Sequence, residues 1–364
     1  MGASAPVVAD LFCGCSGLGL GARNAGFRVA TSIDLDPILT SSYTTNFRDG
    51  KLVLGDLSEL HGDTLLASAG SRLDGIIGGP PCQGFSEMGR SDPNDPRREL
   101  LRHFFRIVAE ARPSFFLMEN VRGLTFPANR PHLEAALEQV SDRYEIVGPL
   151  RIDASEYGAA TKRPRVFVFG YDRDQVDSFG EDDILAARRP AATVADAISD
   201  LKLATQDDDE DGFDVWRFGH GHELPSAYAR RLRAPDGYTT GHCRTPHRPA
   251  ITERFSMVPQ GKIDPVGRHH RLSWQGQSPT IRAGTGPDKG SYQSVRPLHP
   301  DEPRVITVRE AARLQGFPDR FRFHPTVWHS FRMIGNSVSP IVAEALLSVL
   351  YSKMAVVSVP EAAE

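Results

Sequence analysis

The stretch that decides the fold is VVADLFCGCSGLGLG, residues 7–21. It begins with an apolar run of the kind that forms a strand buried on both faces of a sheet. Gly14, Gly17, Gly19 and Gly21 follow where the strand should turn into a helix, and glycines there let a ligand approach the backbone and the helix N-terminus. The segment predicts the start of an α/β protein that binds a nucleotide-like ligand, although tight turns alone would give the same glycines.

Five more short apolar runs follow this segment, and helical patterns lie between them. Because the runs are continuously apolar rather than alternating, they are typical of parallel strands covered by helices on both faces. The alternation of strands and helices predicts a doubly wound parallel sheet. The further strands are expected at 28–34, 51–57, 74–80, 115–121 and 165–171, with helices at 97–111 and 131–141 among those between them.

The pattern changes at about residue 175, where Arg, His, Pro and Gly become frequent and the strands become short. Residues 175–329 are therefore expected to form a smaller, irregular domain, while residues 1–174 and 330–364 form the α/β domain.

A late helix is expected from Pro340 to about Ser352, with Ser339 as its N-cap and proline at its first position. Because this helix comes after the irregular domain, the chain is expected to return and pack on the first sheet.

The net charge of −4 conceals an uneven distribution. Between Arg217 and Arg332 there are 19 Lys and Arg residues against 9 Asp and Glu, which gives +10 in this stretch and −14 in the rest of the chain. We interpret the acidic run at 207–211, just before the basic stretch, as a solvated linker. A basic region within an acidic protein fits contact with nucleic-acid phosphates on one face.

Composition excludes several classes of protein. A hydrophobic content of 40% indicates a sizeable core, and four cysteines at separate positions indicate no disulfide framework. Neither a signal-peptide pattern nor a run of 18 apolar residues occurs, so we expect a cytoplasmic protein with no membrane contact. No metal ion is expected, because Cys13 and Cys15 have no matching second pair of ligands.

Carboxylates end the next two expected strands. Asp34 lies 20 residues beyond Gly14 and could accept both ribose hydroxyls of an adenosine. Asp56, in GDL, could accept a hydrogen bond from the adenine amino group. Nicotinamide-dependent dehydrogenases share the glycines and the first of these acids, so the pattern alone does not identify the cofactor.

Reactive side chains follow the fourth and fifth strands. The fourth strand runs into GPPCQGFS, residues 79–86, which places Cys82 on a proline-stiffened turn at the ligand-binding edge of the sheet. Glu119 ends the fifth strand, and Arg163 and Arg165 project to one side of the later TKRPRV segment. A nucleophilic thiol with a supporting acid and two cations fits this pattern. The alternatives are a buried structural cysteine, a helix-capping acid and a solvated strand face.

Together these motifs resemble those of the DNA cytosine-5 methyltransferases of bacterial restriction-modification systems, over nearly the whole chain. One motif would be weak support, whereas eight in the family's order are specific. They are DLFCGCSGLGLG (10–21), SIDLD (32–36), GDL (55–57), GPPCQGFS (79–86), ENV (119–121), RPR (163–165), REAARLQGFPDRF (309–321) and IGNSVSPIVAEAL (334–346).

The resemblance implies a Rossmann-like, mostly parallel sheet that binds S-adenosylmethionine, with a smaller irregular DNA-recognition domain. It also implies methyl transfer to carbon 5 of cytosine in double-stranded DNA, with S-adenosylhomocysteine as the other product. The residues implied in cofactor binding are Phe12, Gly14, Ser16, Gly17, Leu18, Asp34, Leu35, Asp56, Leu57, Pro80, Leu100, Asn336 and Ser337.

The family's chemistry assigns roles to four residues. Cys82 attacks carbon 6 of the base, Glu119 bonds its N3 edge, Arg165 holds its O2 side and Arg163 orders the loop. The target cytosine must leave the duplex to reach them. The residues expected at the DNA are Gln83, Ser86, Arg90, Arg268, Arg271, Thr280 and Arg282, with Arg244, Arg248 and Arg254 as further basic candidates.

Sequence choice is expected to reside in residues 175–297, and the stretch 268–289 is the best candidate for groove contact because it mixes cations with Gln and Thr side chains. The alternative is a basic loop that touches phosphates only.

Two positions depart from the family pattern. Ser16 stands where the family has glycine and would add a hydroxyl beside the cofactor, and Thr161 stands where the family has glutamine before the two arginines.

A tRNA-methylating enzyme is the main alternative function, and the long span before REAARLQGFPDRF favours the DNA enzyme. A dehydrogenase has no use for GPPCQGFS, and an inactive binding protein would have lost the Cys or the Glu. We expect a monomer whose partner is a cognate restriction endonuclease.

Overall fold

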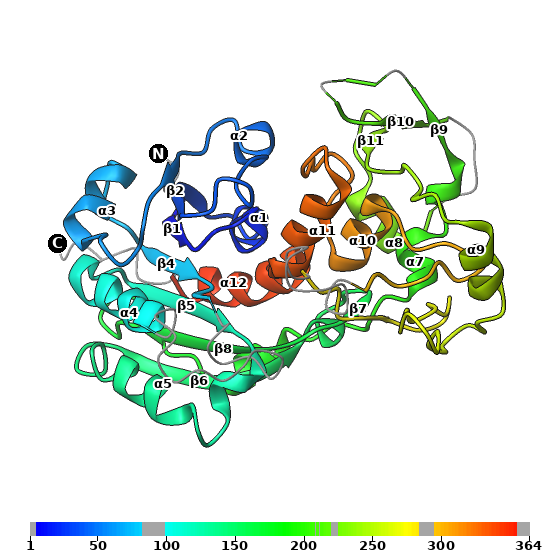
Figure 1. Ribbon diagram of the computed structural model, residues 1–364. Helices are drawn as coiled ribbons and strands as arrows, with labels where there is room; N and C mark the ends of the chain where they lie inside the picture. Colours follow the sequence, from blue (N-terminus) through cyan, green and yellow to red (C-terminus); the bar gives the residue numbers. More distant parts are fainter. Residues whose placement is uncertain are drawn as a thin grey trace.

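The computed structural model describes residues 5–81, 99–207, 209–210, 212–219, 225–283 and 295–354. Its centre is a seven-stranded sheet in the order β3-β2-β1-β4-β5-β8-β6 (Figure 1). All neighbouring pairs from β3 to β5 are parallel, and β8 is antiparallel to both of its neighbours. The strands are β1 (Val7–Leu11), β2 (Arg28–Asp34), β3 (Leu52–Leu54), β4 (Gly75–Gly78), β5 (Phe115–Asn120), β6 (Glu145–Asp153) and β8 (Pro164–Tyr171).

The mostly parallel sheet predicted from the apolar runs is confirmed, with two differences. The last predicted strand, β8, runs antiparallel to β5. The edge strand β6 was not predicted, because its sequence EIVGPLRID is interrupted by Gly148 and Pro149 and mixes charged with apolar residues. The ladder between β6 and β8 shifts register at this interruption, between Val147 and Leu150. An edge strand tolerates such a break because only one side of it needs regular pairing.

Helices cover both faces of the sheet, so alternate residues of each strand enter different cores. Phe116 and Met118 of β5 pack in the cluster that holds helices α3 (Gly62–Ala69), α4 (Glu99–Ala111) and α5 (Arg130–Leu137). Phe115 and Leu117 pack on the opposite face. The helices on that second face are α1 (Gly17–Asn24), α6 (Glu181–Ala186) and α12 (Pro340–Met354).

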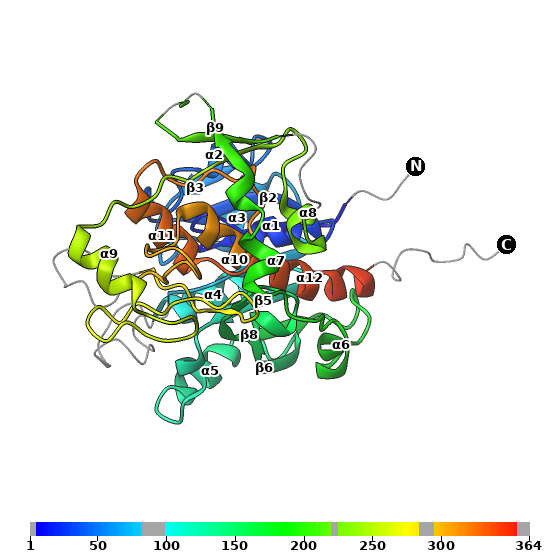
Figure 2. The same cartoon turned by 90° about the vertical axis from the view of Figure 1, so that its right-hand side faces the viewer.

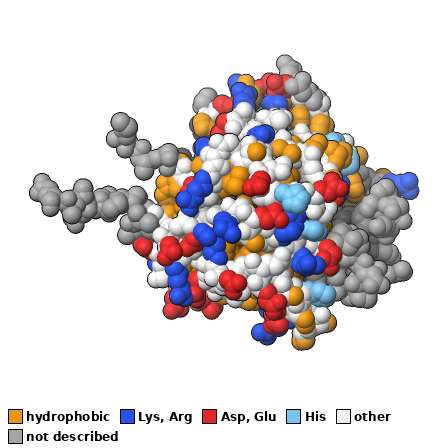
Figure 3. All heavy atoms as spheres, turned by 90° about the vertical axis from the view of Figure 1, so that its left-hand side faces the viewer, with side chains coloured by type: hydrophobic (Ala, Val, Ile, Leu, Met, Phe, Trp, Pro, Cys, Tyr) orange, Lys and Arg blue, Asp and Glu red, His pale blue; other side chains and the backbone are white. Residues whose placement is uncertain are grey.

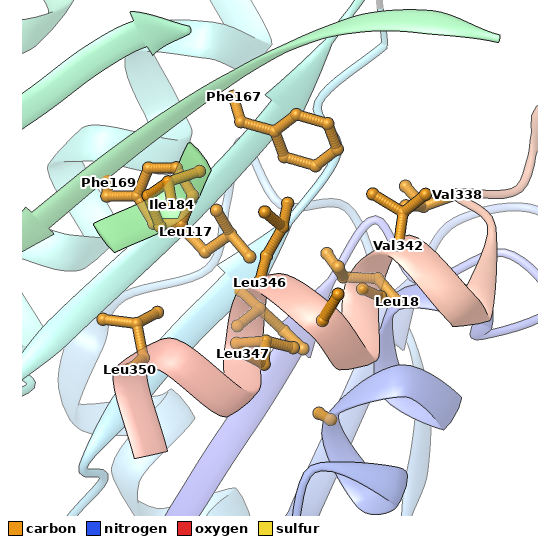
Figure 4. Close-up of a cluster of buried hydrophobic side chains, with 14 of the residues drawn as sticks. Leu18, Leu117, Phe167, Phe169, Ile184, Val338, Val342, Leu346, Leu347 and Leu350 are labelled. Atoms are coloured by element: carbon orange, nitrogen blue, oxygen red, sulfur yellow. The ribbon is translucent and has the colours of Figure 1, made fainter. Parts of the chain in front are cut away.

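The late helix α12 returns to the first sheet, as predicted. Figure 4 shows its residue Leu346 facing Leu117 and Phe167 of the sheet, and the same buried cluster includes Leu347 and Leu18 of α1. Residues 327–354 are apolar and long enough to span a membrane by composition, but they form two helices, α11 (Val327–Asn336) and α12, and most of this stretch is buried inside the protein.

The expected side-chain cap of α12 is wrong. The Ser339 carbonyl accepts from Ala343 N–H, whereas its buried hydroxyl has no hydrogen-bond partner among the described residues.

The middle of the chain folds as short elements beside the sheet (Figures 1 and 2). Strands β9 (Ala204–Gln206), β10 (Val215–Phe218) and β11 (Tyr238–Thr240) form an antiparallel sheet, and β7 (Thr161–Lys162) pairs with β12 (Ser278–Pro279). The helices are α7 (Val194–Ile198), α8 (Ala227–Leu232), α9 (Pro249–Ser256) and α10 (Val308–Gln315), and α2 (Tyr43–Asn46) lies in the first part. The expected domain boundary at 329/330 falls inside α11.

One hydrophobic cluster joins the two parts, since it includes Leu20 of α1 as well as Val194 of α7 and Leu314 of α10. Beside it lie two fully buried guanidinium groups of α10. Arg313 makes a two-pronged ion pair with Asp319, at 2.6 Å for both bonds, and Arg309 donates to backbone oxygens. The Arg313 and Asp319 side chains are both 0% exposed, so each charge depends on the other.

We expect Arg313→Ala to lower the free energy of unfolding by about 3–5 kcal/mol, because it leaves the Asp319 carboxylate buried without its cation. Arg188→Ala is the matched control, since its ion pair with Glu156 is solvent-exposed and should contribute at most about 1 kcal/mol. Urea denaturation followed by tryptophan fluorescence measures both variants. Equal losses in the two variants would contradict a central role for the Arg313–Asp319 pair.

Candidate active site

A cavity of about 570 Å³ lies at the carboxyl ends of β1, β2, β4 and β5. It is bordered by the glycine turn, by the ends of these strands and by the segment that follows α11. Of the predicted cofactor residues, those lining it are Phe12, Gly14, Gly17, Leu18, Asp34, Leu35, Asp56, Leu57, Pro80, Leu100, Asn336 and Ser337; of the predicted catalytic residues, Glu119, Arg163 and Arg165 also line it. Residues far apart in the sequence therefore share one cavity.

The Asp34 carboxylate organises the end of the cavity next to β2. Its Oδ2 accepts from Gly14 N–H and its Oδ1 from Asp36 N–H, both at 2.8 Å. Burial raises the pKa of Asp34, and these backbone hydrogen bonds oppose the rise. Each carboxylate oxygen has a further lone pair, so Asp34 can accept a ligand's hydroxyls while it holds the glycine turn in place.

Asp56 and Leu35 form a more open rim. Asp56 is exposed, and its carboxylate accepts from Ser58 N–H, which lowers its pKa. Leu35 is 62% exposed although it lines the cavity, whereas Leu57 opposite is buried. An apolar side chain exposed beside acceptor groups suits a flat ring that covers it.

The hydroxyl of Ser16 does not lie where it was expected. Its Oγ donates to Asp10 Oδ2 at 2.7 Å, and the side chain is buried rather than lining the cavity. Burial raises the pKa of Asp10 to about 7. Ser16 therefore compensates for a buried carboxylate of β1 and does not add a polar group beside the ligand, which corrects that expectation.

The segment after α11 closes the cavity from the other side. Gly17 must be glycine for this approach, because a Cβ there would lie 1.9 Å from Ser337 Oγ. The Ser337 carbonyl accepts from the buried Gln315 side chain at 3.0 Å, which ties the segment to α10.

Two residues of this wall were missed by the sequence analysis. Arg332 on α11 makes an ion pair with Asp36 at 2.5 Å, and both line the cavity. The signal was present, since Asp36 belongs to SIDLD and Arg332 precedes IGNS, but nothing in the sequence shows that these positions meet.

A buried ion pair lies at the other end of the cavity. Arg165 Nε is 3.0 Å from Glu119 Oε1, and the two side chains are 16% and 11% exposed. Burial raises the pKa of Glu119, and the charges of Arg165 and Arg163 oppose the rise. Pro80 and Pro81 border this end, and the Pro80 carbonyl accepts from the Asn120 side chain at 3.1 Å. Cys82, Gln83, Ser86 and Arg90 lie outside the described residues.

Arg163 connects three parts of the chain. Its buried guanidinium donates to Ile281 O at 3.2 Å and to Gly335 O at 2.7 Å. It lies between the strand that leads to Arg165, the segment after β12, and the residue before Asn336 in the cavity wall.

Thr161, which stands where the family has glutamine, strengthens this junction through its hydroxyl group. It donates to Ser278 O at 3.2 Å, and the Thr280 hydroxyl donates to Lys162 O at 2.8 Å. These bonds reinforce the pairing of β7 with β12. Thr280, expected at the DNA, thus uses its hydroxyl proton within the protein.

The basic residues predicted to face DNA divide into two groups. Arg268 and Arg282 are exposed. Arg271 is 3% exposed, and its guanidinium donates to four backbone carbonyls. They include Phe255 O and, at 2.7 Å, His299 O. The prediction that Arg271 contacts DNA is therefore wrong, because its guanidinium is buried and bonded to backbone carbonyls inside the protein, where a base cannot reach it.

Comparisons with known proteins agree with one another. The family model described as C-5 cytosine-specific DNA methylase matches residues 7–352. The Type II methyltransferase M.XorII of Xanthomonas oryzae pv. oryzae is 38% identical, over 94% of this chain and 83% of that protein. The Type II methyltransferase M.FnuDI of Fusobacterium nucleatum is 31% identical, over 90% of this chain and 89% of that protein.

Solved structures show the same fold. A putative DNA modification methyltransferase encoded within an Escherichia coli prophage has a TM-score of 0.81 and 35% identity, and the match covers 96% of this chain and all of that one. The Dnmt2 methyltransferase of Schizosaccharomyces pombe, with a TM-score of 0.64 and 16% identity over 95% of this chain and 98% of that one, shows likeness of fold alone. The family match and the Type II relatives favour the DNA-methylating reading over the tRNA-methylating one, and the chain belongs to the C-5 cytosine-specific DNA methylases.

Proposed function

We propose that this enzyme transfers a methyl group from S-adenosylmethionine to carbon 5 of a cytosine flipped out of duplex DNA, with Cys82 as the covalent nucleophile. The observation that carries the proposal is the Glu119–Arg165 pair, which lies in the same cavity as Asp34 and next to Pro81, the residue before Cys82. The binding end and the reactive end of the predicted site thus share one space.

The cavity's charges fit a cationic nucleoside better than a dinucleotide. Asp10, Asp34, Asp36 and Asp56 gather around the glycine turn and the strand ends. Asp36 is paired with Arg332, whereas Asp34 and Asp56 have no ion-pair partner within the described ranges. Their negative charges repel a pyrophosphate, which argues against a nicotinamide dinucleotide, and attract a sulfonium or an ammonium group. The buried Oδ1 of Asp10 has no hydrogen-bond partner among the described residues, so the lining retains an unused acceptor.

These residues would hold S-adenosylmethionine in a consistent orientation. Asp34 would accept from the ribose hydroxyls, Asp56 from the adenine amino group, and Leu35 and Phe12 would cover the ring. The cofactor supplies an electrophilic methyl group, and the protein's own task is to make carbon 5 of cytosine reactive.

Cys82 performs that task by adding its thiolate to carbon 6, which forms the S–C bond and shifts electron density to carbon 5. Glu119, whose pKa is raised by burial, holds a proton at the N3 edge as charge develops there. Arg165 keeps Glu119 in place and faces the O2 side. After methylation, water removes the carbon-5 proton and Cys82 leaves.

Residues 175–329 would bind the duplex, and the part that chooses the site would be residues 175–297, since this long stretch carries none of the eight motifs. Figure 3 shows that on the opposite side of the molecule, around α3, Lys and Arg side chains are interspersed with Asp and Glu rather than gathered into a basic face. We further propose a monomer in the cytoplasm, with a cognate restriction endonuclease acting on the same site.

The nucleophile is tested with Cys82→Ser. Methyl transfer should fall below detection, because a serine hydroxyl is scarcely ionised at neutral pH, while the unfolding transition should stay unchanged. Wild-type enzyme given a duplex with 5-fluorocytosine at the target should remain attached to the DNA in denaturant, because fluorine does not leave as a cation. Near-normal turnover by the variant, or no stable adduct with the wild type, would exclude covalent catalysis by Cys82.

The cofactor role is tested with Asp34→Ala. S-adenosylmethionine binding, measured by calorimetry, should weaken by about 1.5–3 kcal/mol, the range for a hydrogen bond to a charged group. Asp49→Ala is the control, because this carboxylate, which is paired with Arg23, lies outside the cavity lining. Equal affinity in both variants would remove Asp34 from the binding site.

A further inference from the structure

Three exposed apolar side chains lie between residues 257 and 266, in the second part of the chain. Met257, Ile263 and Val266 are 69%, 48% and 65% exposed, and they make up half of the large hydrophobic side chains that are exposed in the described ranges. They follow α9, in the chain that forms an outlying margin of the molecule away from the seven-stranded sheet (Figures 1 and 2). We call residues 262–268 the tip.

A buried carboxylate holds the tip in one shape. Asp264 is 0% exposed; its Oδ2 accepts from Gly267 N–H at 2.7 Å, and its Oδ1 is 3.2 Å from Arg254 Nε. Its backbone also bonds within the tip, since Arg268 N–H donates to Asp264 O at 3.0 Å. A Cβ on Gly267 would lie 2.8 Å from Asp264 Oδ2, so the turn needs glycine. The apolar side chains are thus exposed on a preorganised loop.

The base of the tip is equally well fixed, and Arg271 explains why. Gly261 N–H donates to Arg271 O, and Arg271 N–H donates to Lys262 O, at 2.9 and 2.8 Å. The buried Arg271 guanidinium then ties this base to the end of α9 and to residues 299–302. Arg271 therefore fixes the base of the tip, whose own side chains Ile263 and Val266 are exposed.

The charges of the tip favour a polyanionic partner. The Lys262 and Arg268 side chains are exposed, and within the described part of the chain neither has an ion-pair or hydrogen-bond partner. The only carboxylate of the tip is Asp264, which is buried and paired. Arg268 has φ of 60°, an unfavourable left-handed conformation for arginine that the Asp264 hydrogen bonds maintain.

We propose that the tip is a DNA-reading element of this enzyme, inserted into a groove of the duplex. Val266 and Ile263 would contact an apolar base edge such as the thymine methyl group, and Arg268 would donate to a guanine edge. The two exposed apolar side chains of the tip, Ile263 and Val266, are far fewer than a stable protein interface uses, whereas they suffice for one or two base pairs. This inference rests on the proposal that residues 175–297 choose the site.

The connection to the active site is short. Ten residues after Arg268 the chain reaches Ser278 of β12, which pairs with β7, and Ile281 accepts a hydrogen bond from Arg163. A base pair held by the tip is therefore linked to the reactive cavity through backbone hydrogen bonds rather than through a long free loop.

The test compares Val266→Ala, Ile263→Ala and Arg268→Ala with the wild-type chain. Bisulfite sequencing of a duplex library with randomised sequence around a cytosine gives the methylated motif of each protein. We expect each variant to relax one position of the motif and to lose about 5- to 150-fold in kcat/KM on the wild-type site. Leu54→Ala, which changes an exposed leucine at the end of the edge strand β3, and Arg188→Ala are controls that should keep the motif.

Three outcomes would overturn the inference. The motif and kcat/KM could match the wild type in all three variants, which would place sequence readout elsewhere. Arg268→Ala could weaken all sequences alike and reduce the salt dependence, with the apolar variants unaffected, which would mean phosphate contact only. Light scattering could instead show that the apolar variants abolish self-association while methylation stays normal. A wild-type enzyme without any motif would refute the proposed function of residues 175–297 rather than the role of the tip.

Discussion

The rest of the site depends on how a single buried guanidinium is satisfied. Arg163 carries a permanent charge at 3% exposure, and such a charge is tolerated only where hydrogen-bond acceptors replace water. Two of these acceptors are the carbonyls of Ile281 and Gly335, from segments more than 100 residues further along the chain. Because the guanidinium is planar and its donors point in fixed directions, those two segments can approach in one arrangement only.

That arrangement brings the chemistry together. Gly335 precedes the Asn336 and Ser337 wall of the cavity, and Ile281 follows the strand that pairs with β7. Arg165, with its partner Glu119, lies two residues beyond Arg163. Burial raises the pKa of Glu119, and the charges of Arg165 and Arg163 oppose the rise. A disturbance of the junction would therefore affect the cavity wall at Asn336, the Glu119–Arg165 pair and the pairing of β7 with β12 together.

The sequence predicted those features that depend on local pattern. The apolar runs of the parallel strands, the glycine turn and the carboxylates at strand ends are short-range signals, and the structure has them in the predicted places. The edge strand β6 was not predicted, because Gly148 and Pro149 interrupt its pattern. The ion pair between Asp36 and Arg332 was not predicted, because it joins residues 296 positions apart. Ser16 was misjudged for a related reason, since its partner Asp10 lies on the preceding strand and no pattern shows which way a hydroxyl turns.

The arginines show most clearly where counting charges misleads. The excess of positive charge between Arg217 and Arg332 indicated a DNA-facing surface, yet Arg271, Arg304, Arg309 and Arg313 in that stretch are all buried. Their guanidinium groups hold backbone carbonyls or carboxylates, because a planar cation with five donors is well suited to joining irregular segments that lack regular ladders. The surface charge available to phosphates is correspondingly smaller than the sequence suggests. Within the described ranges these four guanidinium groups stabilise the fold, and exposed cations such as Arg268 and Arg282 are the ones that a polyanion can reach.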